Sequence, residues 1–350
     1  DLVRSRGLGD VYKRQDFILA DLKEELAQIS EPAYRANQIF SWLYQKGITS
    51  FGQATDLPRR LRDKLDKHYI IGALELSEHL KSKDRTEKFL FKLSDGNFIE
   101  TVLIPAQGRK TVCLSTQVGC KFACAFCASG LRGFKRNLFS GEMTGQILYL
   151  QQNLGYSLTN FVFMGMGEPL DNYENVIKAI LIMNSPQGMG IASRRITLST
   201  SGIVPGIEKL KNLGLQVNLS LSLHAANDEL RSRLMPVNKK YPLEKTIRAF
   251  EDYLEEGGRK MTLEYVLIED VNDSPQDAEG LAEISRRLRA KVNLIPYSFV
   301  CGLDFKVPSK KAIARFMEIL EEKKVGVTLR RSKGQDIQAA CGQLAGRQKF

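Results

Sequence analysis

The run Gly119–Gly130, GCKFACAFCASG, holds three cysteines, Cys120, Cys124 and Cys127, in the spacing C-x3-C-x2-C. One short loop therefore offers three thiolates. A structural zinc ion takes four protein ligands, and no fourth Cys or His lies nearby in the sequence. Three thiolates on a four-iron cluster instead leave one iron open to a small molecule. The spacing favours one four-iron cluster, and the alternatives are an incomplete zinc knuckle or unrelated thiols.

Segments typical of strands alternate with segments typical of helices after this run begins. Helical stretches such as 140–153 and 275–289 separate the strands, and the second follows a capping box at Ser274 and Asp277. Repeated βα units predict a parallel sheet. Six units are too few for a complete barrel, and no glycine-rich phosphate fingerprint indicates a doubly wound sheet. We therefore predict an α/β fold, a partial (β/α)6 barrel, whose strands are TVCLST (111–116), NFVFMG (160–165), RRITLST (194–200), QVNLSLS (216–222), KMTLEYVLI (260–268) and KVNLIPYS (291–298).

The chain before the predicted barrel divides into a helical part and a β-rich part. Apolar residues recur at helical spacing in 16–29 and 33–47, and Pro58 precedes a third helical segment. Two β-rich runs then flank the turn Asp95–Asn97. Residues 1–15 have no apolar period and are read as an expression or sequence-assembly scar, or else as a basic RNA-binding arm. The expected parts are the scar 1–15, a helical accessory domain 16–75 that binds RNA, a β-hairpin linker 76–110, the barrel 111–325 and a C-terminal catalytic segment 326–350.

The composition is typical of an intracellular enzyme. Of the six cysteines, three are clustered, which favours metal binding over a disulfide framework. No run approaches the roughly 18 apolar residues of a membrane span, and no signal peptide is apparent. With 51 Lys+Arg against 40 Asp+Glu, the net charge of +11 suits a polyanion such as RNA. We expect a cytoplasmic protein with no membrane partner.

Polar residues follow the predicted strands, at the edge where parallel α/β folds build their sites. Glycine at 167 allows close backbone approach to a ligand, and Glu168 can hold an ammonium group or simply be solvated in a tight turn. His224 is equally a site residue or a satisfied core residue. The candidates at strand ends are Gly167, Glu168, Ser199, Ser222, Leu223, His224, Asn293 and Ser298.

Three further cysteines lie outside the clustered run. Cys113 lies on or beside the first predicted strand, and Cys341 lies in the glycine-bounded segment GQDIQAACGQLAG, which we read as a mobile loop. Taken alone, a cysteine such as either of these is more often a small buried apolar residue than a functional one. Cys301 has no motif around it and is taken as structural.

Four groups of basic residues could follow RNA phosphates, or could equally be solvated faces. The groups are Arg132/Lys135/Arg136, Arg194/Arg195, Arg231/Arg233 and Arg330/Arg331/Lys333.

The cysteine spacing, with Phe126 before the third cysteine, resembles the signature of the radical S-adenosylmethionine (SAM) superfamily. An ordered set of motifs further resembles the radical SAM adenine methyltransferases typified by RlmN and Cfr. The set extends from about residue 30 to the C-terminus. It comprises RANQI (35–39), IETVLIP (99–105), VCLSTQVGC (112–120), GFKRNL (133–138), MGMGEPL (164–170), ITLSTSGIVPGI (196–207), SLSLHAAND (220–228), NLIP (293–296) and AACGQLAG (339–346).

This resemblance implies roles for particular residues. Cys120, Cys124 and Cys127 would hold the cluster, Cys341 would carry a methyl group, and Cys113 would release the product by forming a disulfide with it. Glu100 would be a proton acceptor. Ser298 stands where the family commonly has an asparagine that contacts SAM. The implied SAM contacts are Gly167, Glu168, Ser199, Ser222, Leu223, His224 and Ser298.

The resemblance also implies a reaction, namely methylation of adenine C2 in 23S rRNA and of the adenine 3′ of the anticodon in some tRNAs. Two SAM molecules would be used per turnover, with a flavodoxin or ferredoxin as electron donor. The alternatives are a Cfr-like methyltransferase acting on C8, and a non-catalytic RNA-binding metalloprotein. Cys113 and Cys341 argue against the last, because binding alone needs neither thiol.

Overall fold

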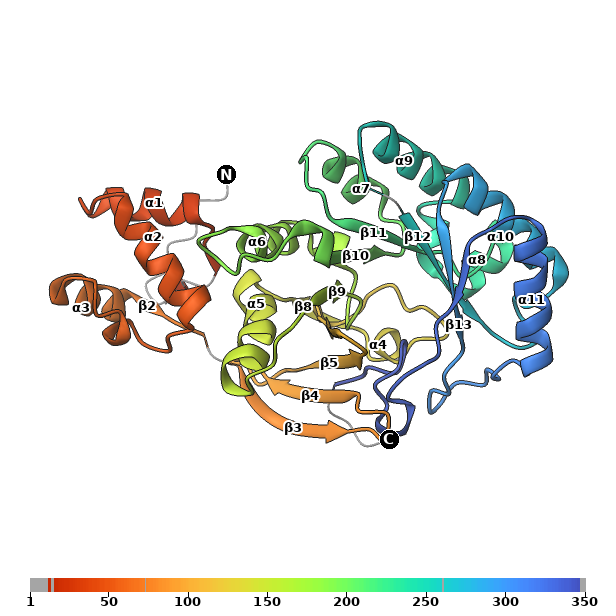
Figure 1. Cartoon of the computed structure of the whole chain (residues 1–350), viewed down its shortest axis with the longest axis horizontal. Helices are drawn as coiled ribbons and strands as arrows, with labels where there is room; N and C mark the ends of the chain where they lie inside the picture. Colours follow the sequence, from red (N-terminus) through yellow and green to blue (C-terminus); the bar gives the residue numbers. More distant parts are fainter. Residues whose placement is uncertain (1–11, 14–15, 73, 260, 347–350) are drawn as a thin grey trace. The chain divides into compact units, whose positions relative to one another are not determined.

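The computed structural model describes residues 12–13, 16–72, 74–259 and 261–346 (Figure 1). The chain forms two compact units. The first comprises Asp1–Leu74, Phe139–Ser157 and Glu174–Ala192, and the second comprises Glu75–Leu138, Leu158–Tyr173 and Ser193–Phe350. Most of the predicted scar, residues 1–11 and 14–15, lies outside the described residues. The two residues of this segment that are described, Tyr12–Lys13, form β1, which pairs in parallel with β2 (Tyr69–Ile70).

The first unit is helical, as its apolar periodicity predicts. Leu22 and Leu26 of α1 share one hydrophobic core with Leu148 and Ile182, which belong to the distant helices α5 and α6. The range predicted for the barrel, 111–325, included both of these segments. The elements are α1 (Leu19–Gln28), α2 (Tyr34–Ser41) continued by a π-helical turn (Trp42–Lys46), a 3-10 turn (Phe51–Gln53), α3 (Arg59–His68), α5 (Ser140–Leu148), a second π-helical turn (Tyr149–Asn153) and α6 (Tyr173–Asn184).

The second unit is built on a ten-stranded sheet in the order β14-β13-β12-β11-β10-β9-β6-β5-β4-β3. All six predicted strands are present and run parallel, and a seventh, β14 (Val327–Leu329), pairs in parallel with β13. The six predicted βα units are therefore present, and β14 adds one further strand beside β13. The six are β6 (Arg109–Cys113), β9 (Asn160–Phe163), β10 (Ile196–Thr200), β11 (Asn218–Ser222), β12 (Met261–Leu267) and β13 (Lys291–Pro296).

The β-rich run before the barrel is part of this same sheet. Strands β3 (Glu75–Lys81), β4 (Glu87–Lys92) and β5 (Phe98–Ala106) form an antiparallel meander whose last strand pairs with β6. The predicted turn joins β4 to β5, with Gly96 at φ 81°. The extension therefore widens the sheet at its β6 edge.

Helices α7 to α11 follow the parallel strands in the second unit (Figure 1). The predicted capping box is confirmed at α10, where the Ser274 hydroxyl accepts from the Asp277 backbone N–H at 3.2 Å. No helix in the described parts of the chain is long and apolar enough to cross a bilayer. The helices are α4 (Ala128–Leu131), α7 (Val204–Lys211), α8 (Asp228–Leu234), α9 (Leu243–Glu255), α10 (Pro275–Arg287) and α11 (Lys310–Glu322), and a small antiparallel sheet pairs β7 (Gln117–Gly119) with β8 (Phe134–Asn137).

Candidate active site

The three clustered cysteines line one cavity of about 160 Å³, which we call the cysteine-loop cavity. The loop turns at Ala123, whose φ of 48° is unusual for a residue with a side chain. The loop then packs closely against α4. Glycine at 130 permits this approach, because a Cβ there would lie 2.9 Å from the Ala123 Cα. Backbone bonds from Cys120 to Gly133 (3.2 Å) and from Ala125 to Leu234 (2.8 Å) fix both ends.

The donor set suits a multi-iron cluster better than a single ion. Burial raises the pKa of Cys120 to about 12, and the pKa values of Cys124 and Cys127 are also raised, chiefly by burial. Without a positive charge nearby to offset burial, these thiols stay protonated. A bound metal ion supplies that charge and deprotonates its thiol ligands. In the part of the chain that the structure describes, no three Cys, His, Asp or Glu side chains are arranged around a single metal ion. Three buried thiols from one loop that face one cavity fit the thiolate ligation of a [4Fe-4S] cluster.

Five of the predicted SAM contacts line this same cavity, namely Gly167, Glu168, Ser199, Ser222 and His224. The chain reaches them from the ends of β9, β10 and β11, as expected for parallel strands. The Ser199 and Ser222 hydroxyls lie 3.3 Å apart. At Gly167, φ is 100° and a Cβ would lie 2.5 Å from the Gln117 Cβ, so only glycine fits there.

The Glu168 carboxylate already has several protein partners. Its Oε1 accepts from the Leu170 backbone N–H at 3.0 Å, and its Oε2 accepts from the Ser201 N–H and hydroxyl, each at 2.8 Å. Burial raises its pKa, and these hydrogen bonds oppose the shift. Glu168 therefore joins the end of β9 to the end of β10 while facing the cavity.

His224 is both a satisfied buried residue and a cavity residue. Its φ is 58°, and its Nδ1 accepts from the Val266 backbone N–H at 3.0 Å, which leaves a neutral ring's proton on Nε2. The ring meets Phe126 edge to face, with centroids 4.9 Å apart. Burial, assisted by the Arg231 charge, lowers its pKa to about 3. The imidazole is therefore neutral at physiological pH.

Two other predicted contacts lie outside the lining of this cavity. Leu223 is a core residue whose carbonyl accepts from Arg231 Nε at 3.1 Å. Ser298 is buried, and its hydroxyl accepts from Gln335 Nε2 at 3.2 Å. Neither side chain is among the described residues that line the cysteine-loop cavity.

Arg231 corrects the sequence-based interpretation, which placed it on a basic surface. Its side chain is fully buried, with 0% exposure. The guanidinium donates to the Ser201 carbonyl at 2.7 Å and to Asn238 Oδ1 at 2.6 Å. It also reaches the Ser222 carbonyl at 3.3 Å. Arg231 thus ties together the ends of β10 and β11, which carry the cavity residues.

Replacing Arg231 by methionine is expected to destabilise the protein by about 2–4 kcal/mol. Methionine keeps much of the volume but leaves buried carbonyls without donors, at a cost of roughly 1–3 kcal/mol each. Urea unfolding of the holoprotein measures the change. Arg233→Met is the matched control, because Arg233 lies two residues away on the same helix and is exposed. Equal unfolding midpoints for the two variants would contradict the structural role of Arg231.

A larger cavity of about 1010 Å³, the two-thiol cavity, is lined by both Cys113 and Cys341. Cys113 is buried and Cys341 is exposed, and each carries a free thiol. Burial, reinforced by the neighbouring Cys341, raises the pKa of Cys113 to about 12. Cys127 and Cys341 line both cavities, so the cysteine loop and the two further thiols face adjoining spaces.

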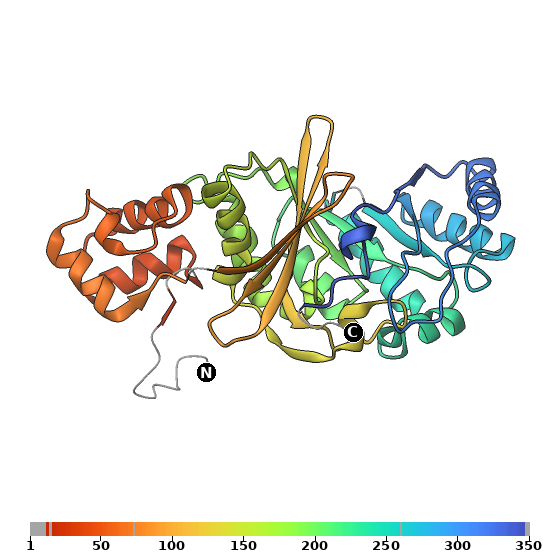
Figure 2. The same cartoon turned by 90° about the horizontal axis from the view of Figure 1, so that it is seen from below.

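The C-terminal segment with Cys341 is anchored, contrary to the mobile loop expected from its glycines. The Glu100 carboxylate accepts from the backbone N–H groups of Ala345 (2.6 Å) and Gly346 (2.9 Å). Lys88 Nζ lies 3.0 Å from Glu100 and donates to the Gln338 carbonyl at 3.1 Å. Figure 2 shows this dark blue segment beside the orange strands β3–β5. Glu100, 4% exposed, is an anchor in this arrangement and does not line either cavity among the described residues.

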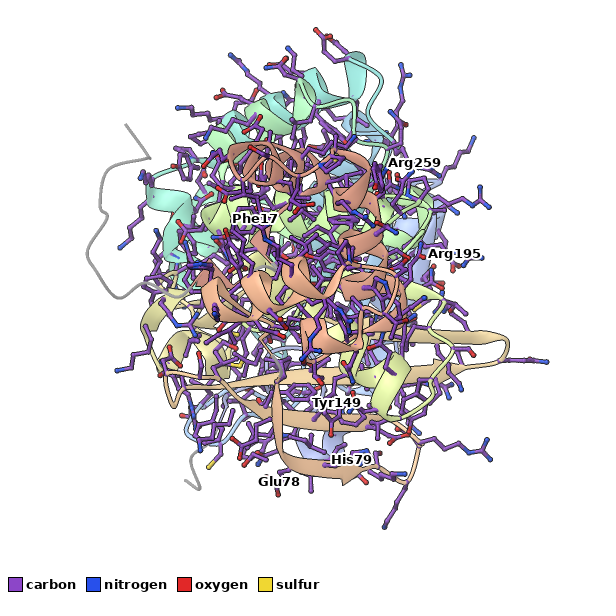
Figure 3. All side chains as sticks on the ribbon, turned by 90° about the vertical axis from the view of Figure 1, so that its left-hand side faces the viewer. Phe17, Glu78, His79, Tyr149, Arg195 and Arg259 are labelled. Carbon is purple, nitrogen blue, oxygen red and sulfur yellow. The ribbon has the colours of Figure 1, made fainter. Side chains whose placement is uncertain are left out.

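Replacing Glu100 by alanine is expected to loosen this anchor. Hydrogen bonds to a charged group contribute about 1.5–3 kcal/mol, so amide hydrogen exchange in residues 338–346 should accelerate about tenfold or more. Exchange followed by mass spectrometry of peptides checks this. Glu78→Ala is the control, because Glu78 is exposed on β3 (Figure 3). Unchanged protection of the segment would show that Glu100 does not hold it.

The basic groups predicted from sequence fall in different environments. Arg136 pairs with Asp95, which lowers the pKa of that carboxyl against the effect of burial. Arg195 is exposed (Figure 3). The fourth group, Arg330/Arg331/Lys333, lines the two-thiol cavity together with basic residues that the sequence analysis had not grouped with it. Its basic lining residues are Arg109, Arg259, Arg289, Lys291, Arg330, Arg331 and Lys333.

Two residues missed by sequence reasoning line both cavities, Glu264 and Arg330. Arg330 was grouped only as a basic residue. Glu264 carried a signal, because it is a lone charge inside the apolar strand KMTLEYVLI. A buried charge in a strand needs a partner, and Arg330 Nη1 lies 3.7 Å from Glu264 Oε2.

Comparisons with known proteins agree with this architecture. Residues 114–282 match the radical SAM superfamily model, and residues 15–71 match the ribosomal RNA large subunit methyltransferase N-terminal domain. The dual-specificity RNA methyltransferase RlmN of Syntrophus aciditrophicus (strain SB) is 45% identical over 335 residues, 95% of this chain and 96% of that protein. The "Probable dual-specificity RNA methyltransferase RlmN" of Thermoanaerobacter sp. (strain X514) is 44% identical over 335 residues, with 95% and 98% covered.

A solved structure supports the same conclusion. The crystal structure of a radical SAM methyltransferase from Sphaerobacter thermophilus matches with a TM-score of 0.90 at 44% identity, covering 96% of this chain and 100% of that one. The predicted radical SAM α/β fold with a helical N-terminal region is thereby confirmed. The chain belongs to the RlmN family of radical SAM RNA methyltransferases.

Proposed function

We propose that this enzyme converts an adenine of 23S rRNA, and the adenine 3′ of the anticodon in some tRNAs, to 2-methyladenine. The observation that carries the proposal is the two-thiol cavity, in which Cys113 and Cys341 face one space next to the cysteine loop. A binding protein has no use for this pair. A methyl transfer that passes through a protein-bound carbon needs one thiol to carry the carbon and another to release it.

Carbon 2 of adenine is electron-poor and has no lone pair to attack a sulfonium methyl group. Polar transfer therefore fails at this carbon. Bound to the chain, a reduced [4Fe-4S] cluster and SAM supply a 5′-deoxyadenosyl radical. Cys120, Cys124 and Cys127 would hold the cluster, while the polar wall of Gly167, Glu168, Ser199, Ser222 and His224 would hold SAM.

Cys341 would first act as a nucleophile. Its thiolate displaces the methyl group from one SAM molecule, forming an S–CH3 bond and releasing S-adenosylhomocysteine. Exposure of Cys341 to the cavity suits this step. After loss of one hydrogen atom to the radical from a second SAM, the S–CH2 carbon bonds to adenine C2. Two SAM molecules are thus used per turnover.

Cys113 would then resolve the protein–RNA link. Its thiolate attacks the Cys341 sulfur, so an S–S bond forms as the S–CH2 bond breaks, and the carbon keeps the electron pair and takes up a proton. Beforehand a base would remove the C2 proton, and the unpaired electron left on the ring would have to pass to an acceptor, a role that the oxidised cluster would supply. Glu100 serves as that base only if the C-terminal segment moves, because its carboxylate here holds Ala345 and Gly346. An electron donor of the flavodoxin or ferredoxin type would reduce the cluster and restore the thiols.

RNA is the substrate that best suits the surroundings of the two thiols. Seven Arg and Lys side chains line the two-thiol cavity, so phosphates next to a flipped-out base would meet positive charge. We further propose that residues 16–75 form an accessory RNA-binding domain, where Arg59 and Arg60 are exposed at the start of α3. These substrates would place the enzyme in the cytoplasm.

The product of an in vitro reaction tests the proposal. Reduced holoenzyme, RNA and SAM with a CD3 methyl group should give 2-methyladenosine whose methyl carries two deuteriums, because one is removed from the S-methyl and one hydrogen is added on release. Digested nucleosides are compared with 2-methyl and 8-methyl standards by mass spectrometry. Only the 8-methyl isomer would replace the C2 proposal by a Cfr-like reaction. Neither isomer, with the cluster intact, would favour the non-catalytic RNA-binding protein.

A further inference from the structure

The wall shared by the two cavities carries a buried carboxylate oxygen that lacks a donor. Glu264, on β12, is 4% exposed and lines both cavities. Its Oε1 accepts from Asn293 Nδ2 at 2.9 Å. Its Oε2 has no partner at hydrogen-bond geometry among the described residues, although the Ser220 hydroxyl lies close to the carboxylate. A buried carboxylate oxygen without a donor is costly, so this oxygen suits a ligand that brings an N–H or O–H group.

A guanidinium lies next to this oxygen on the same wall. Arg330 directly follows β14. Its backbone N–H donates to the Leu294 carbonyl at 2.8 Å, which fixes the position of the Arg330 backbone beside β13. Its Nη1 lies 3.7 Å from Glu264 Oε2, too far for a hydrogen bond. It also approaches the Met164 sulfur at 3.8 Å. The wall therefore presents an acceptor and a donor side by side toward the two-thiol cavity.

An adenine ring has the complementary pattern. Its exocyclic N6 amino group donates, and the ring nitrogens on either side accept. Hypoxanthine and guanine place an oxygen acceptor at position 6, which would face the carboxylate of Glu264. A base that reacts with carbon on Cys341 must lie beside that thiol, and Glu264 and Arg330 line the two-thiol cavity together with Cys341. Flipped-out bases are read in this way, by hydrogen bonds to their edges.

We propose that Glu264 and Arg330 form the subsite that recognises the substrate adenine. Glu264 Oε2 accepts from the N6 amino group, and Arg330 donates to a neighbouring ring nitrogen. Asn293 is a positioning residue that orients the Glu264 carboxylate. The inference rests on the proposed function, since it takes the base that enters between the two thiols as the ligand. It goes further by naming the contacts that select adenine.

Base analogues in the RNA test the subsite. A stem-loop RNA would carry adenine, purine or hypoxanthine at the target position, and its affinity for anaerobic holoenzyme without reductant would be measured by fluorescence anisotropy. Wild type should prefer adenine to purine by about tenfold or more, as expected for a good pair of base-edge contacts. In Glu264→Gln this preference should fall to about twofold. Hypoxanthine should gain affinity in that variant, because the amide N–H can donate to O6.

Glu283→Gln is the matched control, because Glu283 is exposed on α10 and should keep the wild-type preference. Equal binding of purine and adenine RNA by wild type would overturn the inference without reliance on any variant. So would an unchanged preference in Glu264→Gln. Weakened SAM binding in that variant with the base preference intact would assign the pair to the cofactor, and would also overturn it.

The binding readout separates this inference from the proposed function. Binding discrimination needs no turnover, so adenine selection by Glu264 in an enzyme that forms no 2-methyladenosine would overturn the proposed function alone. Conversely, 2-methyladenosine formed without any contribution of Glu264 to base selection would overturn the subsite alone.

Discussion

Replacing Cys113 by alanine is expected to stop the enzyme after one turnover, with its RNA covalently attached. The carbon on Cys341 would bond to adenine as before, but no thiolate would be present to break the S–CH2 bond. Cys113 and Cys341 line the same cavity, and Cys113 is buried there, which protects its thiol from other partners. A serine or alanine in its place cannot form the disulfide. Denaturing gels and mass spectrometry should show a protein–RNA adduct approaching one per active chain.

Matched variants make this result specific. Cys341→Ala should give neither adduct nor product, because the carbon carrier is gone. Cys301→Ala should behave as wild type, because Cys301 is exposed and lies away from the described lining of the two-thiol cavity. Normal turnover by Cys113→Ala without any adduct would show that the two-thiol mechanism does not operate in this enzyme.

The parallel sheet could be predicted because its strands carry their own signal. Alternation of apolar runs with helical periods identified β6 and β9–β13. Strand β14 is three residues long and follows Gly326, so its pattern cannot be distinguished from a loop. The helix α5 was predicted, within 140–153, but its packing partners were not. Periodicity shows that a face is apolar, whereas sharing a core with α1 depends on tertiary contacts that a single sequence does not record.

The site could be predicted where topology alone determines position. Parallel strands end at one edge, so Gly167, Ser199, Ser222 and His224 had to lie near the cysteine loop. The buried position of Arg231 could not be predicted, because DELRSRL reads as an exposed helix. Its burial is stabilised by acceptors from other parts of the fold, such as the Ser201 and Ser222 carbonyls at the ends of β10 and β11. The anchor of the C-terminal segment also escaped prediction, since Glu100 and Ala345 are 245 residues apart.

Replacing any one of Cys120, Cys124 and Cys127 by alanine is expected to remove the iron–sulfur cluster. Each thiol faces the same cavity, and two remaining thiolates on a loop cannot hold four irons. Iron content should fall from about four atoms per chain to near zero, and the visible absorption and SAM cleavage should disappear with it. Cys301→Ala should retain all three properties.

These losses should occur without unfolding, because the loop has anchors that do not involve the thiols. The Ala125 N–H donates to the Leu234 carbonyl at 2.8 Å, and the Ala128 N–H donates to the Gly342 carbonyl at 2.7 Å. Far-ultraviolet circular dichroism of the three variants should therefore match that of wild type. A single variant that kept four irons would remove its cysteine from the ligand set. If all three variants lost their folded spectra, the cluster would be required for the fold itself, which these backbone bonds argue against.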